Sequence, residues 1–177
     1  MDGIERCIDD EIPFDIPESW AWARLGTVIQ LISGQDMTPD KYNNKEQGVP
    51  YITGASNIEN GNVIVNRWTT MPKSIAENGD LLITCKGTVG AMAVLHCDRV
   101  HIARQIMAIK VGSLLCHEYL FCFLETYITK FKSVAKSMIP GISRDDVLTA
   151  LFPLPPLAEQ YCIVKSIELL TDKIDTL

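Results

Sequence analysis

The feature that most constrains this chain is a series of short apolar runs between residues 49 and 111, each ended by a turn. The runs are residues 49–53, 63–65, 81–85, 91–96 and 101–111. Asn60-Gly61 and Asn78-Gly79 are turn sequences of the kind that join antiparallel strands. Short strands joined by such turns predict a twisted, mostly antiparallel sheet or half-barrel.

The hydrophobic period changes after this series. Between residues 114 and 136, apolar side chains recur every three or four positions, as in Leu120, Leu124 and Ile128, which predicts a helix with one apolar stripe. Pro140-Gly141 ends this helix, and Ser143 is suited to cap a short helix over residues 144–148. Strands followed by helices indicate a mixed α/β chain of the α+β class, with helices flanking the sheet.

The C-terminal segment has the most regular pattern. After a proline-rich connector at residues 152–157, apolar side chains follow a 4-3-4-3 spacing typical of helices that pack lengthwise on a partner. The predicted partner-helix interface consists of Ile163, Ile167, Leu170, Ile174 and Leu177. We therefore expect a flexible lead-in at residues 1–15, a globular domain at 16–153 and a coiled-coil-type helix from 154 to 177. The seam has no stop signal, which predicts that the helix either continues further or is completed by another chain.

The charge distribution points to a local basic face. The whole chain has a net charge of −6 and a pI of about 5.0, which argues against nucleic-acid binding. Residues 61–144, however, contain 10 basic and 5 acidic side chains, whereas both flanking segments are acidic. Screening limits the field of a patch to about 8–10 Å, so a local basic face is sufficient to bind phosphates. The candidates for phosphate contact are Lys130, Lys132, Lys136 and Arg144.

No motif for catalysis or for a resident cofactor is present in the sequence. It has no phosphate-binding Gly-rich loop with Lys-Ser/Thr, no Gly-x-Ser-x-Gly and no His-Glu-x-x-His. The six cysteines form no Cys-x-x-Cys pair, and His96 and His101 are interpreted as surface or edge histidines. Leu154-Pro155-Pro156-Leu157 lacks the polar first residue expected of an adenine methyltransferase. No run reaches the roughly 18–20 apolar residues of a membrane span, so we expect a soluble cytoplasmic protein without enzymatic activity.

Five motifs, in order, resemble one family over residues 16–177. They are Ile-Pro-Glu-Ser-Trp at 16–20, Gly-Val-Pro-Tyr-Ile at 48–52, Gly-Asp-Leu-Leu-Ile at 79–83 with Lys-Gly-Thr-Val-Gly at 86–90, Arg-Gln-Ile-Met-Ala-Ile at 104–109 and Leu-Pro-Pro-Leu-Ala-Glu-Gln at 154–160. On these residues the sequence resembles the specificity (S) subunit of type I restriction-modification systems, the DNA methylase S family. The last motif, which leads into the heptad helix, is the most specific of the five.

The resemblance implies a function and a set of partners. A target-recognition domain of this family reads one half of a bipartite double-stranded DNA site, and the following helix is a spacer. The subunit docks methyltransferase and restriction subunits, so S-adenosylmethionine, ATP and magnesium belong to those partners and none is expected here. A full family member has two such domains and two such helices. This chain is therefore either a half-length subunit that forms a homodimer through its C-terminal helix or a fragment.

For base recognition we favour polar side chains at loop tips. These are Gln35, Lys86, Thr88 and Ser143, together with Arg104 and Gln105, which fall within a predicted strand. Two other interpretations remain open. The chain could be a stand-alone enzyme remnant, such as a nuclease or methyltransferase, or a protein-interaction module that does not bind DNA directly, which its acidic total charge would suit.

Overall fold

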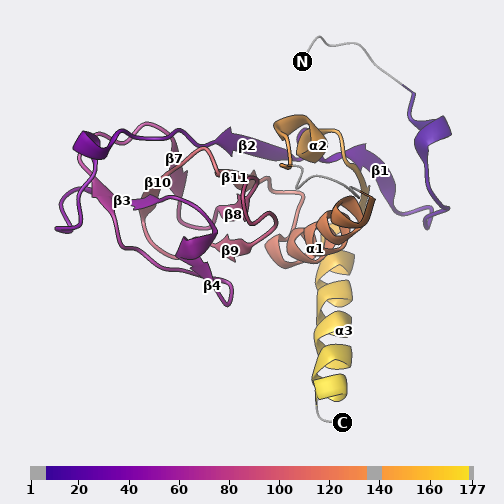
Figure 1. Ribbon diagram of the computed structural model, residues 1–177. Coiled ribbons are helices and arrows are strands. Elements are labelled where there is room, and N and C mark those ends of the chain that lie inside the picture. The colour runs from indigo at the N-terminus through magenta and orange to yellow at the C-terminus, as the bar shows by residue number, and fades with distance from the viewer. Residues whose placement is uncertain (1–6, 135–140, 176–177) are drawn as a thin grey trace.

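Two four-stranded sheets form the body of the molecule, and the α-helices gather at one end of it (Figure 1). The computed structural model describes residues 7–134 and 141–175, with the side chains of 130–134 and 175 left out. The antiparallel sheet has the order β2 (Ile29–Ser33), β11 (Ile106–Val111), β8 (Leu81–Thr84) and β9 (Met92–Val94). The mixed sheet has the order β6 (Trp68–Thr69), β3 (Val49–Ile52), β10 (Arg99–Ile102) and β7 (Ile75–Glu77), in which only the β3–β10 pair is parallel.

Two short strand pairs, the α-helices and the 3-10 turns complete the fold. Strand β1 (Ala21–Arg24) pairs with β12 (Leu151–Leu154), and β4 (Ile58–Glu59) forms a hairpin with β5 (Asn62–Val63). The α-helices are α1 (His117–Val134), α2 (Arg144–Leu148) and α3 (Leu157–Asp175). The 3-10 turns are η1 (Asp9–Glu11), η2 (Leu25–Thr27), η3 (Pro39–Lys41) and η4 (Ala55–Asn57). This arrangement confirms the predicted α+β class with antiparallel sheets, flanking helices and a long C-terminal helix.

Strands β8 and β11 are buried on both faces, because each face has its own core. In β8, Leu81 and Ile83 belong to the cluster under the helices, whereas Leu82 belongs to the cluster between the sheets. In β11, Ile109 belongs to the cluster under the helices and Ala108 to the cluster between the sheets. Because side chains alternate across a strand, such a position requires an unbroken apolar run. Burying one aliphatic side chain completely contributes about 1.5–3 kcal/mol to the free energy of folding. The apolar runs that form β8 and β11 therefore supply much of the stability and lie at the centre of the fold.

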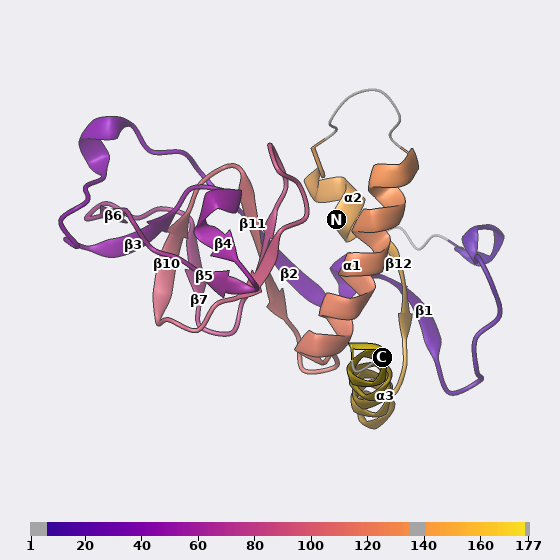
Figure 2. The same cartoon turned by 60° about the horizontal axis from the view of Figure 1, so that its bottom comes forward.

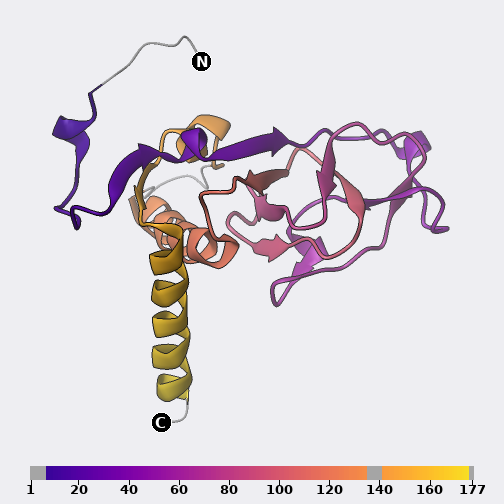
Figure 3. The ribbon, with the colours of Figure 1, turned by 180° about the vertical axis from the view of Figure 1, so that it is seen from behind.

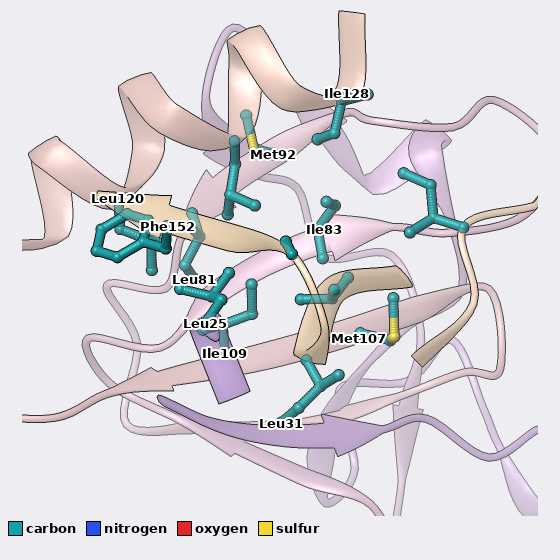
Figure 4. Close-up of a cluster of buried hydrophobic side chains, with 14 of the residues drawn as sticks. Leu25, Leu31, Leu81, Ile83, Met92, Met107, Ile109, Leu120, Ile128 and Phe152 are labelled. Atoms are coloured by element: carbon teal, nitrogen blue, oxygen red, sulfur yellow. The ribbon is translucent and has the colours of Figure 1, made fainter. Parts of the chain in front are cut away.

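Helix α1 covers the outer face of the antiparallel sheet. Leu120, Leu124 and Ile128 follow the predicted four-residue spacing, and all three are buried in the cluster under the helices, where Leu120 lies beside Phe152 of β12 (Figure 4). The proline-rich connector at residues 152–157 begins as a strand. Its residues 152–154 pair with β1, and the residues after them form the link to α3.

Helix α3 leaves the domain at a fixed angle and projects away from it (Figure 3). Its base is held by the fully buried Gln160, whose Oε1 accepts the Cys116 amide at 2.8 Å. The Gln160 Nε2 donates to the carbonyls of Leu114 and Pro155 at 3.0 and 2.9 Å. The bonds to Cys116 and Leu114 join the first turn of α3 to the residues just before α1, and the bond to Pro155 fixes the start of α3 itself, so the direction of α3 is set by the folded domain.

Candidate nucleic-acid interface

The segment after β2 and the turn between β10 and β11 meet at the ends of their strands. The Gln35 amide donates to the carbonyl of Ile102 at 2.9 Å. The Asp36 carboxylate accepts the backbone amide of Arg104 at 3.2 Å and pairs with its guanidinium Nε at 2.6 Å. Gln35 and Arg104, which are 69 positions apart in the sequence, are thus fixed on neighbouring loops.

This turn corrects one sequence prediction. The sequence predicts that Arg104 and Gln105 fall within a strand. They instead lie in the turn between β10 and β11, and both are exposed. The turn contains no glycine or proline, and it is held by long-range bonds such as the Asp36–Arg104 pair, which no local pattern indicates.

The loop between β8 and β9 joins the same surface. Its first residue, Cys85, donates its amide to the Gln105 carbonyl at 2.8 Å. The buried Thr84 hydroxyl donates to the Thr88 carbonyl at 2.7 Å and accepts the Ala91 amide at 2.8 Å, which closes the loop from inside. Lys86 and Thr88 are therefore presented on a braced loop.

Gln105 lies between two glycines from different loops. A Cβ added to Gly54 would lie 2.5 Å from the Gln105 Oε1, and one added to Gly87 would lie 3.9 Å from it. Gly87 has a φ of +72°, a conformation that favours glycine. The two glycines leave room for the Gln105 carboxamide at the surface.

The residues before α2 form the last part of this surface. The Ile142 amide donates to the Cys85 carbonyl at 2.9 Å. A Cβ on Gly141 would lie 2.9 Å from the same carbonyl oxygen and 3.5 Å from the Lys86 Cγ. The surface formed by residues 34–36, 54, 85–88, 104–105 and 141–144 is called the loop cluster below. It brings the six predicted base-contact residues onto adjoining loops.

Two of the candidate side chains are already engaged within the fold. Ser143 caps α2 as predicted: its hydroxyl accepts the Asp146 amide at 3.1 Å, and the Asp146 carboxylate accepts the Ser143 amide at 2.7 Å. The Arg144 Nη1 donates to the Leu31 carbonyl of β2 at 2.6 Å. Arg144 thereby ties α2 to the sheet, and its guanidinium has fewer donors left for phosphate.

The remaining candidates differ in how free their side chains are. Gln35, Lys86, Thr88 and Gln105 are exposed, and within the described part of the chain their side chains have no hydrogen-bond partner. The Arg104 side chain is 67% exposed but paired with Asp36. Of the predicted phosphate contacts, Lys130 and Lys132 lie in the last turns of α1, where only the backbone is described, and Lys136 lies outside the described residues.

A buried histidine supports the loop cluster, which corrects a second prediction. His101, expected at a surface or an edge, is fully buried in β10, and its ring lies 4.9 Å from that of Tyr51. Its Nε2 lies 3.0 Å from the Gln35 carbonyl oxygen, and its Nδ1 accepts the Ser74 amide at 3.2 Å. Burial lowers the pKa of His101, whereas the carbonyl of Gln35 and that of Ser74, which lies 3.1 Å from Nδ1, raise it. In the sequence, His101 is one histidine within a hydrophobic run, and nothing near it indicates that it is buried and holds the Gln35 segment.

Tyr51 supports the same segment from beneath. Its hydroxyl accepts the Met37 amide at 3.2 Å, and burial raises its pKa, so it remains a neutral phenol. Tyr51 is 3% exposed, so its ring belongs to the core and is not available to stack on a base. Residues 35–37 are thus anchored to the mixed sheet by two buried aromatic side chains.

The described residues contain no cluster of three or more His, Cys, Asp or Glu side chains that could hold a metal ion. All six cysteines are unpaired. Among the described helices, none combines the length and apolar character needed to cross a membrane. The loop cluster offers amides, a hydroxyl and cationic groups, which are groups that bind and discriminate hydrogen-bonding ligands.

The predicted seam on α3 divides into two parts. Ile163 packs against the core together with the buried Val164. Ile167, Leu170 and Ile174 are 40, 60 and 69% exposed, so the seam emerges from the domain as an apolar stripe. Leu177 lies outside the described residues.

Comparison with protein families identifies one match that covers most of the chain. Residues 17–177 match the type I restriction modification DNA specificity domain. The MjaX type I restriction enzyme specificity subunit of Methanocaldococcus jannaschii is 28% identical over 167 residues, which cover 91% of this chain and 39% of that protein. The EcoKI specificity subunit of Escherichia coli K12 is 25% identical over 181 residues, covering 91% of this chain and 38% of that protein.

Solved structures show the same fold. The HsdS subunit of Thermoanaerobacter tengcongensis superposes with a TM-score of 0.82 and 27% identity, over 93% of this chain and 40% of that one. The type I restriction-modification S subunit of M. genitalium gives a TM-score of 0.63 at 16% identity, over 90% and 41%. The chain thus spans about two fifths of the length of the relatives it matches.

Proposed function

Because this chain belongs to the family of type I restriction modification DNA specificity domains, we propose that it reads one half of a bipartite DNA target for a type I restriction-modification complex. Membership confirms the family inferred from the five motifs, and with it the interpretation as a specificity module rather than an enzyme. The proposal places the domain on double-stranded DNA as part of a complex that works in the cytoplasm.

The observation that carries the proposal is the loop cluster. Loops from both sheets and from the α1–α2 connection converge there, and Gln35, Lys86, Thr88 and Gln105 extend from braced backbones without a partner in the described residues. Carboxamide and ammonium groups match the purine edges of the major groove. A braced loop loses little conformational entropy on binding, which favours discrimination.

Phosphate contacts position such a domain, whereas base contacts specify the sequence. We assign positioning to Lys130, Lys132 and Lys136, which follow one another at the end of α1 and beyond it. Arg144 joins this group through whichever of its donors the Leu31 carbonyl leaves free. The acidic segments at either end of the chain are then expected to lie away from the duplex.

We assign partner contacts to the exposed stripe of α3. A second copy of this helix, or the equivalent helix of a longer chain, would cover Ile167, Leu170 and Ile174 and set the distance between two recognition domains. Methyltransferase and restriction subunits would then dock on the assembled specificity subunit and supply S-adenosylmethionine, ATP and magnesium chemistry.

The same stripe and the net charge of −6 favour one alternative, a protein-interaction module that does not touch DNA. The test is selection from a pool of duplexes with a randomised central segment, using the full chain assembled with its methyltransferase subunit. The proposal predicts enrichment of a short sequence motif. A pool recovered without any motif, or not retained at all, would favour the interaction module.

A further inference from the structure

Strands β3 and β6 lie at the end of the molecule away from the α-helices (Figure 2), and a second polar surface lies beside them. Five residues line an open hollow of about 460 Å³ there, beside β3 and β6: Tyr42, Asn43, Asn44, Asn66 and Arg67. None of them belongs to the loop cluster or was singled out in the sequence. The lining combines three carboxamides, a guanidinium and an aromatic ring.

One wall of the hollow is built around Asn43. Its Oδ1 accepts the amides of Lys45 and Gln47 at 2.9 and 3.2 Å, and its Nδ2 donates to the carbonyls of Gln47 and Trp68 at 2.9 and 3.2 Å. The two donors and the two acceptor lone pairs of this amide are thereby all used inside the fold. Asn44 follows directly, exposed and without a hydrogen-bond partner among the described residues.

The loop that carries Asn43 and Asn44 is rigid for a second reason. Glu46 and Gly48 have φ angles of +60° and +98°. A Cβ on Gly48 would lie 2.2 Å from the Thr69 carbonyl oxygen, so the backbone approaches β6 too closely for any side chain. The wall is thus held in one conformation before any ligand binds.

A second part of the lining, around Asn66, is oriented by a buried amide. Asn57 is fully buried; its Nδ2 donates to the Ile64 carbonyl at 2.7 Å and to the Asn66 Oδ1 at 3.3 Å. Because the Asn66 oxygen accepts from Asn57, the Asn66 NH₂ group is left to donate outward. No partner for that NH₂ exists within the described residues.

Arg67 completes the hollow. Its guanidinium carbon lies 5.2 Å from the centre of the Tyr42 ring, and Tyr42 packs in turn on Tyr51 at 5.6 Å between ring centres. This cation–π contact restrains the guanidinium, and its N–H groups donate to no other side chain or carbonyl among the described residues. No carboxylate pairs with Arg67 in the part of the chain that the structure describes.

We propose that this hollow reads the purine edge of a base pair, with Arg67, Asn44 and Asn66 as specificity-determining residues. A guanidinium donates two bonds to guanine O6 and N7, and a carboxamide pairs with adenine N6 and N7. An aromatic-stacked arginine beside two restrained amides supplies both patterns. The inference deepens the proposed function and rests on it, because it places a second base contact outside the loop cluster.

The two surfaces can lie on one duplex. Residues 35–42 connect them, with Gln35 in the loop cluster and Tyr42 in the hollow, and both ends rest on Tyr51 or its neighbour His101. Seven residue steps span at most about 25 Å. That is about seven base-pair steps at 3.4 Å each, so both surfaces fall within reach of a single half-site.

The test repeats the randomised-duplex selection with Arg67→Ala, Asn44→Ala and Asn66→Ala in the full chain assembled with its methyltransferase subunit. Arg67→Ala should relax the enriched motif at one or two base-pair positions, with roughly 5- to 150-fold lower discrimination there. Arg67→Lys should keep overall affinity and still lose that discrimination, because an ammonium lacks the fork. The matched control is Asn62→Ala on β5, whose side chain donates only within its own turn, to Asn60.

Unchanged thermal unfolding would show that each variant is folded. An unaltered motif with uniformly weaker binding would mean that Arg67 contacts only phosphate, and an unaltered motif with unaltered affinity would mean that the hollow does not touch DNA. Either result overturns the inference while the wild-type motif still supports the proposed function. A wild-type pool without any motif contradicts both.

Discussion

The Nε2 atom of His101 lies 3.0 Å from the carbonyl oxygen of Gln35, so a fully buried imidazole holds the start of a loop whose side chains face solvent. On the other side of the ring, Nδ1 lies 3.2 Å from the Ser74 amide nitrogen and 3.1 Å from the Ser74 carbonyl oxygen. Asp36 and Lys73 are the charged groups nearest to it, and their effects on its pKa oppose each other. The position of the loop that carries Gln35 therefore depends on a titratable group beneath it.

This arrangement predicts a stability change in mild acid. Because burial lowers the pKa of His101 in the folded state, the unfolded chain binds more protons as the pH falls below about 6.5. The free energy of unfolding should be constant above that pH and should decrease between about pH 6.5 and 5. His101→Gln should flatten this decrease in urea titrations at each pH. An equal pH dependence in both proteins would remove His101 as its source.

Gly54→Ala should change recognition while leaving the fold intact. Gly54 has an extended φ of 171°, which alanine adopts, and the new Cβ would meet only the movable Gln105 Oε1 at 2.5 Å. The Gln105 carboxamide should move, altering the enriched duplex motif with a change in unfolding free energy under about 1 kcal/mol. Gly48→Ala is the contrasting variant. At Gly48 the new Cβ would lie 2.2 Å from the Thr69 carbonyl oxygen, and φ is +98°, so the Gly48→Ala protein should unfold far more readily than wild type.

Charging the α3 stripe should abolish pairing without unfolding the domain. Ile167 and Leu170 are 40 and 60% exposed, so Ile167→Glu with Leu170→Glu removes little internal packing. Multi-angle light scattering should show a fall from the assembled to the single-chain mass. Lys165→Glu, also exposed on α3, is the control for added negative charge. A mass unaffected by the double variant would exclude the stripe as the interface.

Removing charge at Lys132 and Lys136 should weaken binding to every duplex and lower its salt dependence. Each lost phosphate contact reduces the slope of log K against log salt by about 0.9, so the double alanine variant should lose about 1.8. Lys165→Ala should leave the slope unchanged, because Lys165 is on the proposed spacer helix. If the double variant keeps the wild-type slope, the phosphate assignment at the end of α1 is wrong.

Gln160→Ala should loosen the base of α3. The substitution leaves the Cys116 amide and two carbonyls without their buried partner, which costs about 1–3 kcal/mol per unsatisfied group. Chemical denaturation should show this loss, whereas Gln30→Ala, at an exposed position of β2, should fall within about 0.5 kcal/mol of wild type. Equal stability of the two variants would contradict the role assigned to Gln160.

The elements set by local pattern were predictable from the sequence. The α1 stripe, the Ser143 capping box and the apolar runs of β8 and β11 depend on neighbours a few positions away. The parallel pairing of β3 with β10 was not predictable, because it joins segments about 50 positions apart. The turn at Arg104 was missed for a related reason: it is stabilised by Asp36 rather than by a glycine of its own.

The candidate site likewise contains some residues that the sequence indicated and others that it did not. Loop residues such as Lys86 and Thr88 could be selected because a Gly-rich break between apolar runs must reach the surface. The residues of the hollow beside β3 and β6 could not be selected from the sequence. Asn44, Asn66 and Arg67 are ordinary polar residues there, and only the hydrogen bonds of Asn43 and Asn57 in the folded chain bring them together.

The most direct test of the account is a genome-wide map of modified bases in cells that carry the intact system. We predict that the wild-type chain gives a two-part recognition sequence, and that Lys86→Ala combined with Gln105→Ala relaxes the bases contacted by this domain while the spacing set by α3 is kept. A recognition sequence identical in wild type and variant, at undiminished levels of modification, would contradict the claim that the loop cluster reads DNA.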